Sequence, residues 1–364
     1  MFKIYLECLL NRLPVYGLLF DELSGAVEKL GLPKYRSRQI QKAIFDNRVD
    51  CLSEITTLPL NIRSSLEEKF LLNSLKTVTR QTSKDGTTKL LLETADGLQF
   101  ETVMIPETRS DENRRTLCVS TQVGCGFDCA FCATGKLQFK RNLSAEEIIS
   151  QLITAERELG CKITNVVFMG MGEPMLNLDN VIKSLRIICE NTLMSKRKIT
   201  ISTSGVVSGV LRLAEEYPHV KLAISLHALN DSVRRKIIPA SEKWSINELI
   251  SSAEVYYNAS GLPITYEYIL FEGLNDSHDD ISRLARICRR MPSKVNLIHY
   301  HDISFTNPEG VASELRPSSH ESVRKFAEDL RALGVNAFVR ASAGDDINAA
   351  CGQLALSGAD QTED

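Results

Sequence analysis

The sequence predicts an α/β fold: a partial (βα)6 barrel preceded by a small helical domain and a β-meander. Three patterns carry this prediction. Helical periodicity runs through residues 18–75, alternation with a period of two runs through 75–105, and strand and helix patterns alternate from 116 to 340. Such alternation is typical of a parallel sheet covered by helices. With 364 residues, 43% of them hydrophobic, the chain can form one large domain and a smaller one.

The N-terminal part of the chain is predicted to form three short helices. Apolar residues recur with helical spacing at Leu23–Leu30, Arg36–Phe45 and Leu60–Leu72. An earlier apolar run, Ile4–Phe20, is interrupted by charged and polar residues, so it fits neither a secretion signal nor a membrane span. We therefore expect a cytoplasmic protein without a membrane segment.

A three-stranded meander is predicted next. The turn dipeptides Asp85-Gly86 and Asp96-Gly97 separate three runs of alternating polar and apolar residues. The predicted strands are Thr77–Thr82, Thr88–Glu93 and Leu98–Ile105.

The rest of the chain is predicted to form the barrel. The expected strands are Thr116–Thr121, Ile163–Met169, Lys198–Ser202, Val220–Leu226, Ile264–Phe271, Lys294–Tyr300 and Asn336–Arg340. The expected helices are Ser144–Leu159, Leu178–Asn191, Val206–Glu216, two near Ser232 and Ile246, Asp279–Arg290 and His320–Leu333. Six strands precede the last helix, which favours a partial barrel over a closed eight-stranded one. In such barrels the loops after the strands carry the chemistry.

Three cysteines lie on the loop between the first predicted barrel strand and its helix. Ser144 followed by Glu147 has the pattern of a capping box, which marks where that helix begins. Cys125, Cys129 and Cys132 are spaced C-x3-C-x2-C between glycines, so their sulfur atoms can converge on one metal cluster. Closed iron–sulfur and zinc sites use four ligands, so this set leaves one position open.

Two alternatives for this loop are a zinc site with a distant fourth ligand and a group of buried structural thiols. Structural zinc sites usually pair their cysteines in two C-x2-4-C units, and this loop lacks that spacing. The spacing therefore favours the cluster.

Polar residues follow the next three predicted strands. Gly172 and Glu173 come after the second strand, where glycine lets the backbone approach a ligand and a carboxylate can accept from an ammonium group. Ser202 ends the third strand, and Ser225-Leu226-His227 ends the fourth. Taken separately, Ser202 and His227 are better explained by capping and core packing. Their shared position beside the cysteine loop favours a ligand site.

Two further cysteines complete a pattern that covers nearly the whole chain. Cys118 lies in Leu117–Gly124, and Cys351 lies in Gly344–Leu354. Together with the cysteine loop, these runs resemble the radical SAM (S-adenosylmethionine) adenine-C2 methyltransferases of 23S rRNA, the RlmN type, from residue 34 to residue 354. The resemblance implies a radical SAM barrel that uses one [4Fe-4S] cluster and two SAM molecules per turnover.

The resemblance also implies a role for each candidate residue. The cluster would be held by Cys125, Cys129 and Cys132. SAM would be bound by Gly172, Glu173, Ser202, Ser225, Leu226 and His227. Cys351 would carry the methyl group, Cys118 would resolve the intermediate, and Glu101 would accept a proton.

The chemistry of adenine explains why two cysteines are needed besides the cluster ligands. C2 is electron-poor and cannot attack the SAM methyl group as a nucleophile. In the route that the resemblance implies, Cys351 becomes S-methylcysteine and its methyl carbon is joined to C2 by radical chemistry, which attaches the RNA to the protein. A disulfide between Cys118 and Cys351 then releases the product.

The sequence departs from the family pattern at three places. His301 stands where the family usually has an asparagine that contacts SAM, and we expect His301 to replace it as a donor. Gln138 replaces a common glycine before the basic pair Lys140-Arg141. The tail ends 13 residues after Cys351, which is shorter than in many relatives.

The expected organisation is an N-terminal RNA-binding domain at 1–75, a β-meander linker at 76–110, a radical SAM core at 111–354 and a tail at 355–364. The expected partners are 23S rRNA, tRNA as a further substrate, and an electron donor such as flavodoxin. We expect the protein to act as a monomer.

RNA binding would depend on local basic patches, because the net charge is −3. The candidate patches are Arg36, Arg38, Lys42 and Arg48; Lys136, Lys140 and Arg141; Lys196, Arg197 and Lys198; and Arg234, Arg235 and Lys236. Each run taken singly is better explained as a solvated surface. The remaining cysteines are interpreted as small core residues: Cys8, Cys51, Cys161, Cys189 and Cys288.

Two alternatives to C2 methylation remain. The related C8 methyltransferases of the Cfr type usually have Ala where this chain has Pro174 and Ile where it has Ser204, so both residues favour C2. A non-catalytic iron–sulfur or zinc RNA-binding module would need neither Cys118 nor Cys351.

Overall fold

The computed structural model describes residues 12–106, 114–192 and 194–356. Within these ranges the main sheet has ten strands in the order β14-β13-β12-β11-β10-β9-β6-β5-β4-β3. From β6 to β14 neighbouring strands are parallel. The parallel strands are β6 (Arg115–Cys118), β9 (Asn165–Phe168), β10 (Ile199–Thr203), β11 (Lys221–Ser225), β12 (Ile264–Leu270), β13 (Ser293–His299) and β14 (Ala337–Val339).

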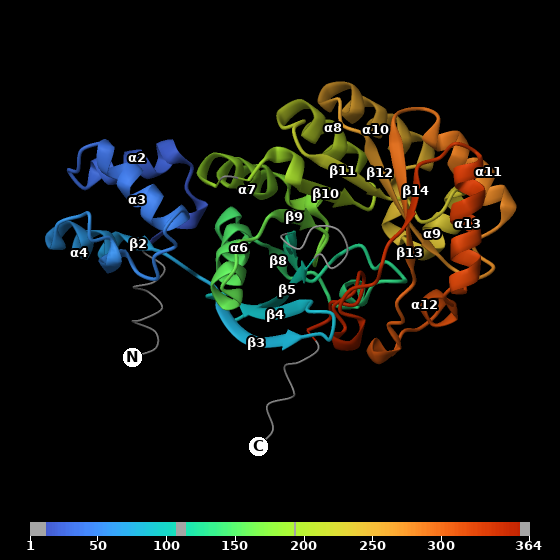
Figure 1. The fold of residues 1–364 in the computed structure, drawn as a ribbon, viewed down its shortest axis with the longest axis horizontal. Helices are drawn as coiled ribbons and strands as arrows, with labels where there is room; N and C mark the ends of the chain where they lie inside the picture. The colour runs from blue at the N-terminus through green and yellow to red at the C-terminus, as the bar shows by residue number, and fades with distance from the viewer. Residues whose placement is uncertain (1–11, 107–113, 193, 357–364) are drawn as a thin grey trace, which may run out of the picture.

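Helices connect the parallel strands and cover the outside of the curved sheet (Figure 1). They are α6 (Ala145–Leu159), α7 (Leu178–Asn191), α8 (Val207–Glu216), α9 (Asp231–Ile237), α10 (Ile246–Ser260), α11 (His278–Cys288) and α13 (His320–Ala332), with the short α5 (Ala133–Lys136) and α12 (Val311–Glu314). In the described chain, six parallel strands precede α13 and β14 follows it. The predicted α/β fold with a partial (βα)6 barrel is therefore confirmed.

The predicted meander belongs to the same sheet as the barrel. Its strands are β3 (Lys76–Thr82), β4 (Thr88–Glu93) and β5 (Gln99–Pro106). They pair antiparallel with one another, and β5 pairs antiparallel with β6, with Val103 opposite Cys118. The meander thus extends the barrel sheet beyond its first strand.

The N-terminal helices are α2 (Phe20–Lys29), α3 (Tyr35–Phe45) and α4 (Leu60–Lys69), and they lie beyond α6 and α7 at one end of the molecule (Figure 1). The predicted last turn of α4, up to Leu72, is wrong. Phe70–Leu71 forms the short strand β2, which pairs with β1 (Leu13–Pro14), so tertiary pairing overrides helix propensity there.

Polar contacts join this helical region to the barrel. Arg48 Nε lies 2.8 Å from Glu156 Oε2 of α6, and Lys183 Nζ of α7 lies 2.9 Å from Glu22 Oε1 of α2. A Cβ atom on Gly17 would lie 2.8 Å from Glu146 Cβ, so glycine permits close packing on α6. Arg48, expected in a basic patch, is instead half-buried and ion-paired.

The start of α6 fixes the end of the cysteine loop. Ser144 Oγ accepts from Glu147 N at 3.1 Å, and Glu147 Oε2 accepts from Ser144 N at 2.8 Å, which confirms the predicted capping box. Arg141 joins this helix end to the meander, with ion pairs to Glu147 at 2.8 Å and to Asp96 at 2.7 Å. Arg141, expected in a basic surface patch, therefore forms ion pairs within the protein.

Some expectations fall on residues outside the described ranges. These are the first eleven residues of the N-terminal domain, the boundary near residue 110 and the tail from residue 357. Among the helices of the described residues, none combines the length and the apolar character that crossing a membrane requires.

Candidate active site

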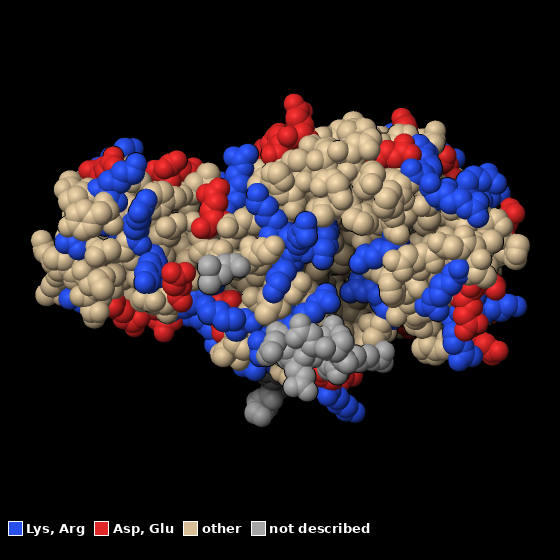
Figure 2. All heavy atoms as spheres, turned by 45° about the horizontal axis from the view of Figure 1, so that its top comes forward, with Lys and Arg blue, Asp and Glu red and all other residues tan. Residues whose placement is uncertain are grey.

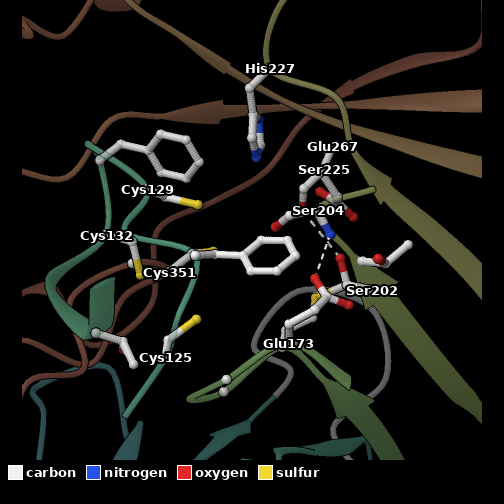
Figure 3. A pocket seen from close by; sticks show the side chains of 18 of the residues that line it. Cys125, Cys129, Cys132, Glu173, Ser202, Ser204, Ser225, His227, Glu267 and Cys351 are labelled. Carbon is white, nitrogen blue, oxygen red and sulfur yellow. Dashed lines mark hydrogen bonds between the residues drawn. The ribbon is translucent and has the colours of Figure 1, made fainter. Parts of the chain in front are cut away.

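One pocket gathers most of the predicted site residues at the carboxyl ends of the barrel strands (Figure 3). Its lining includes Cys125, Cys129, Cys132, Gly172, Glu173, Ser202, Ser225, His227 and Cys351. In Figure 3 the three loop cysteines lie on one side of the pocket, and Glu173, Ser202 and Ser225 lie opposite them. The parallel topology explains this gathering, because the loops after the strands meet at one edge of the sheet.

Backbone contacts fix the cysteine loop. It leaves β7 (Gln122–Val123) and returns through β8 (Arg141–Asn142), and Lys140 N donates to Val123 O at 2.9 Å. Gly124 has a φ of 73°, and a Cβ atom there would lie 2.2 Å from Gln138 O, so only glycine fits. Gln138, one of the departures from the family, contributes its backbone to this contact while its side chain is exposed.

The three thiols are suited to a cluster. Burial raises the pKa of Cys125 to about 12 and raises the pKa values of Cys129 and Cys132, and the neighbouring thiols raise those of Cys125 and Cys129 further. Metal binding to such thiols releases their protons. Among the described residues, no group of three or more His, Cys, Asp or Glu, the three loop cysteines included, is already arranged around a single metal position. Three thiols around an open pocket match a cluster with one open position.

Glu173 presents a carboxylate to the pocket. Its Oε2 accepts from Ser204 N at 2.8 Å and its Oε1 accepts from Met175 N at 3.0 Å. Burial raises the pKa of this carboxyl to about 7, and the two backbone hydrogen bonds oppose the rise. Gly172 has a φ of 92°, and a Cβ atom there would lie 2.4 Å from Gln122 Cβ, so glycine is required beside the carboxylate.

His227 is a neutral donor at the pocket wall. Burial, with a contribution from the cation Arg234, lowers its pKa to about 3. Its Nδ1 accepts from Ile269 N at 3.1 Å, which leaves the ring proton on Nε2. Its ring also packs edge-on against Phe131, with centroids 4.8 Å apart. His227 can therefore donate one hydrogen bond to a ligand.

A buried arginine, expected in a basic surface patch, organises the strand ends. Arg234 is 1% exposed, and its guanidinium donates to Ser204 O at 2.6 Å, Ser225 O at 3.0 Å and Leu226 O at 3.1 Å. Its basic neighbours Arg235 and Lys236 are exposed. The sequence pattern of three consecutive charges therefore did not reveal that Arg234 alone is buried. Leu226 does not line the pocket; it is fully buried and contributes its backbone to this network.

A second pocket adjoins the first one. Cys118 and His301 line it, and Cys351 and Arg340 line both pockets. Burial raises the pKa of Cys118 to about 12, while Arg340 opposes the rise. Cys351 is exposed. Arg340 Nη1 also lies 3.6 Å from Glu267 Oε2. Cys118 and Cys351 are free thiols, so the disulfide expected during the reaction is not formed in this structure.

Besides Cys118 and Leu226, two further predicted residues do not line the first pocket, namely His301 and Glu101. His301 Nδ1 pairs with Asp345 Oδ1 at 2.9 Å, in the segment that carries Cys351. Glu101 is fully buried, and its Oε1 lies 3.1 Å from Lys89 Nζ. Burial raises the pKa of Glu101, and the Lys89 ammonium opposes the rise.

The remaining cysteines are less buried than expected. Cys51, Cys161, Cys189 and Cys288 are all half-buried. Cys189 and Cys288 pack against the hydrophobic core, so the interpretation as core residues holds in part for these two and not for Cys51 and Cys161. Cys288 ends α11, and Cys189 lies near the end of α7, where the helix surface meets solvent. Cys8 lies outside the described residues.

Comparisons with known proteins identify the class. The sequence profile of the radical SAM superfamily matches residues 119–285. A solved radical SAM methyltransferase from Sphaerobacter thermophilus superposes with a TM-score of 0.86 and 39% identity, over 94% of this chain and 99% of that one. The fold and the three-cysteine pocket thus define a radical SAM enzyme, and this class implies a [4Fe-4S] cluster and SAM.

Curated relatives narrow the family. A probable dual-specificity RNA methyltransferase RlmN from Thermotoga maritima is 42% identical over 342 residues, which is 93% of this chain and 96% of that protein. The ribosomal RNA large subunit methyltransferase N of Nitrosopumilus maritimus is 41% identical over 350 residues, covering 93% and 97%. The chain belongs to the RlmN family of radical SAM RNA methyltransferases.

Proposed function

We propose that this enzyme methylates C2 of an adenine in 23S rRNA, and of a tRNA adenine as the dual-specificity relatives' names suggest. One observation carries the proposal. Cys351 lies where the pocket of the three cluster cysteines and the SAM-binding residues adjoins the pocket that contains Cys118. A methyl carrier must reach both the methyl donor and the thiol that later releases it.

The residues of the first pocket suit the binding of SAM. The carboxylate of Glu173 can accept from the SAM ammonium, and Nε2 of His227 and the hydroxyls of Ser202 and Ser225 can hold its other polar groups. When bound, the cluster and SAM supply the methyl group and the radical chemistry. The requirement of two SAM molecules per turnover is part of this proposal.

Cys351 and Cys118 have separate roles in the rest of the proposed reaction. The Cys351 sulfur accepts the methyl group and carries it as S-methylcysteine. The radical chemistry supplied by bound SAM and the cluster would remove one hydrogen atom from this methyl group and take one electron from the adduct, so that the carbon joins C2 in a covalent protein–RNA intermediate. Loss of the C2 proton, with Glu101 as the proposed acceptor, precedes attack by Cys118 and formation of a Cys118–Cys351 disulfide. The raised pKa of Glu101 favours proton uptake.

Residues at the first pocket favour C2 over C8. Pro174 and Ser204 differ from the residues usual in C8 methyltransferases, and both line the pocket. The backbone N–H of Ser204 also holds the Glu173 carboxylate, so this position is coupled to the SAM site.

The surface supports RNA binding around the pocket mouth. Figure 2 shows Lys and Arg side chains gathered around a hollow in the middle of one face. The cysteine loop contributes the exposed Lys140. The exposed run Lys196, Arg197 and Lys198 precedes β10, so it lies at the amino-terminal edge of the sheet, away from the pocket. A reactive base must leave its stack to enter the barrel, so a loop adenosine should react much better than a paired one.

The decisive experiment is mass spectrometry of nucleosides from RNA treated with the reconstituted enzyme and SAM. 2-Methyladenosine in 23S rRNA supports the proposal, and 8-methyladenosine would contradict it. A parallel reaction with tRNA tests the second substrate. We further propose that the enzyme is a cytoplasmic monomer and that a flavodoxin-type protein supplies the electrons for its cluster.

A further inference from the structure

The segment that carries Cys351 is held by side chains of the β-meander. It follows β14 and covers residues 344–356, which we call the carrier segment. Its regular structure is a short 3₁₀ turn at Asp345–Ile347. The strands of the meander lie beside this segment at the lower edge of the barrel (Figure 1).

The first set of contacts comes from the turn between β3 and β4. Asp85 Oδ2 accepts from Gly344 N at 2.9 Å, and Ser83 Oγ donates to Asp346 Oδ1 at 2.5 Å. Gly344 has a φ of 69°, and a Cβ atom there would lie 2.8 Å from Thr87 Cγ2. The turn therefore fixes where the carrier segment begins.

The second set comes from a buried ion pair on β4 and β5. Lys89 and Glu101 have side chains that are 2% and 1% exposed, and Nζ lies 3.1 Å from Oε1. Lys89 Nζ also donates to Asn348 O at 3.4 Å, and Glu101 Oε2 accepts from Leu356 N at 3.1 Å. The pair thus contacts the segment on both sides of Cys351.

The opposite side of the segment rests on the cysteine loop. Ala133 N donates to Gly352 O, and Thr134 Oγ1 donates to Leu354 O, both at 2.6 Å. Cys351 is therefore held between the meander and the cluster ligands. A buried ion pair is costly to leave uncompensated, so the Lys89–Glu101 pair favours the arrangement in which its remaining hydrogen bonds to the carrier segment are made.

We propose that side chains of the meander hold the carrier segment in place and that Lys89 is a positioning residue for Cys351. This inference rests on the proposed function for the identity of Cys351 as methyl carrier. The placement of the segment itself is independent of that identity. Misplacing a reacting atom by about 1 Å can cost on the order of a hundredfold in rate.

The test compares Lys89→Met with Lys76→Met in the reconstituted enzyme. Lys76 lies on the neighbouring strand β3, and its ion pair with Glu93 is on the surface at 3.9 Å, so it is a matched control. Hydrogen exchange of residues 344–356 should become roughly tenfold or more faster in Lys89→Met and stay unchanged in Lys76→Met. The rate at which Cys351 gains a methyl group from SAM should fall by about 10- to 100-fold, with normal iron content and SAM affinity.

Exchange and methylation in Lys89→Met equal to those of Lys76→Met would overturn the proposal. If Lys89→Met does not fold, Asp85→Asn serves instead: it keeps an oxygen for Thr87 N and removes the acceptor for Gly344 N. Asp85→Asn should speed hydrogen exchange at Gly344 by several-fold. An unchanged exchange rate would contradict the proposal that the meander holds the carrier segment. A wild-type enzyme that never methylates Cys351 would refute the proposed function. The exchange measurement would still test whether the meander holds the carrier segment, because it does not depend on methylation.

Discussion

The cysteine loop and the carrier segment bring thiols to the same pocket, but they are held in different ways. Backbone hydrogen bonds between β7 and β8, a glycine packed against Gln138 O and the capped start of α6 fix the cysteine loop. The carrier segment is held mainly by side chains from distant parts of the chain, including Asp85, Glu101 and His301.

The difference matches what each thiol must do. Cluster ligands stay in one arrangement throughout turnover, so a backbone framework suits them. A carrier cysteine must exchange partners, and a segment held by a few side-chain contacts can move when those contacts open. The comparison teaches that one pocket can combine a fixed wall, held by its own backbone, with a wall held by side chains from distant parts of the chain.

The largest effect should come from the fixed wall. Replacing Cys129 by Ala removes one of the three proposed cluster ligands, so iron content and methyl transfer should fall to background while the fold remains. Cys189→Ala, which removes a half-buried thiol that does not line the pocket, should keep both iron and activity. Elemental analysis with circular dichroism measures this. Normal iron in the Cys129 variant would remove the basis for the cluster assignment.

The two lone cysteines, Cys351 on the carrier segment and Cys118 at the end of β6, should fail differently. Cys351→Ala should yield no methylated protein and no attached RNA, because the carrier sulfur is missing. Cys118→Ala should accumulate protein covalently bound to RNA, because the resolving thiol is missing. The adduct is visible as a slow band in denaturing gels that nuclease removes. Normal turnover by Cys118→Ala would mean that another group resolves the intermediate.

Glu173 should make the stability of the cluster-free protein depend on pH. Its pKa is raised from 4.5 to about 7 in the folded protein. The unfolded chain therefore loses its proton at lower pH than the folded protein, so stability present below pH 4.5 is lost as the pH rises to about 7. The loss is about 3 kcal/mol at most.

Glu173→Gln removes this titration, so its denaturant-derived stability should fall less steeply between pH 4.5 and 7 than that of the wild type. Parallel pH profiles for the two proteins would show that Glu173 does not have the raised pKa. Because both are measured without the cluster, the comparison isolates the carboxyl group.

The smallest effect concerns the exit of the cysteine loop. Ser144→Ala removes the cap of α6 and should cost about 1 kcal/mol in stability. Ser245→Ala removes the equivalent cap of α10, away from the loop, and should cost about the same. Cluster loss on dilution should be faster in the Ser144 variant alone. Equal retention of iron in both would show that the cap does not support the loop.

Features carried by neighbouring residues could be predicted from the sequence. The order of strands and helices, the capping box at Ser144 and the three loop cysteines all follow from local spacing, because periodicity and ligand spacing act over a few residues. The polar residues at the strand ends, such as Glu173 and His227, were predictable because parallel topology brings those ends together.

Contacts between distant residues were decided by the tertiary structure. The burial of Arg234 under three strand-end carbonyls, the end of α4 at Lys69 and the half-burial of Cys189 depend on packing that no local pattern records. The same holds for the Lys89–Glu101 pair, whose partners lie on adjacent strands and whose remaining hydrogen bonds reach the carrier segment. The sequence by itself determined which thiols line the first pocket. Only the folded chain decided what holds Cys351 beside them, because hydrogen bonds and burial depend on distances in space.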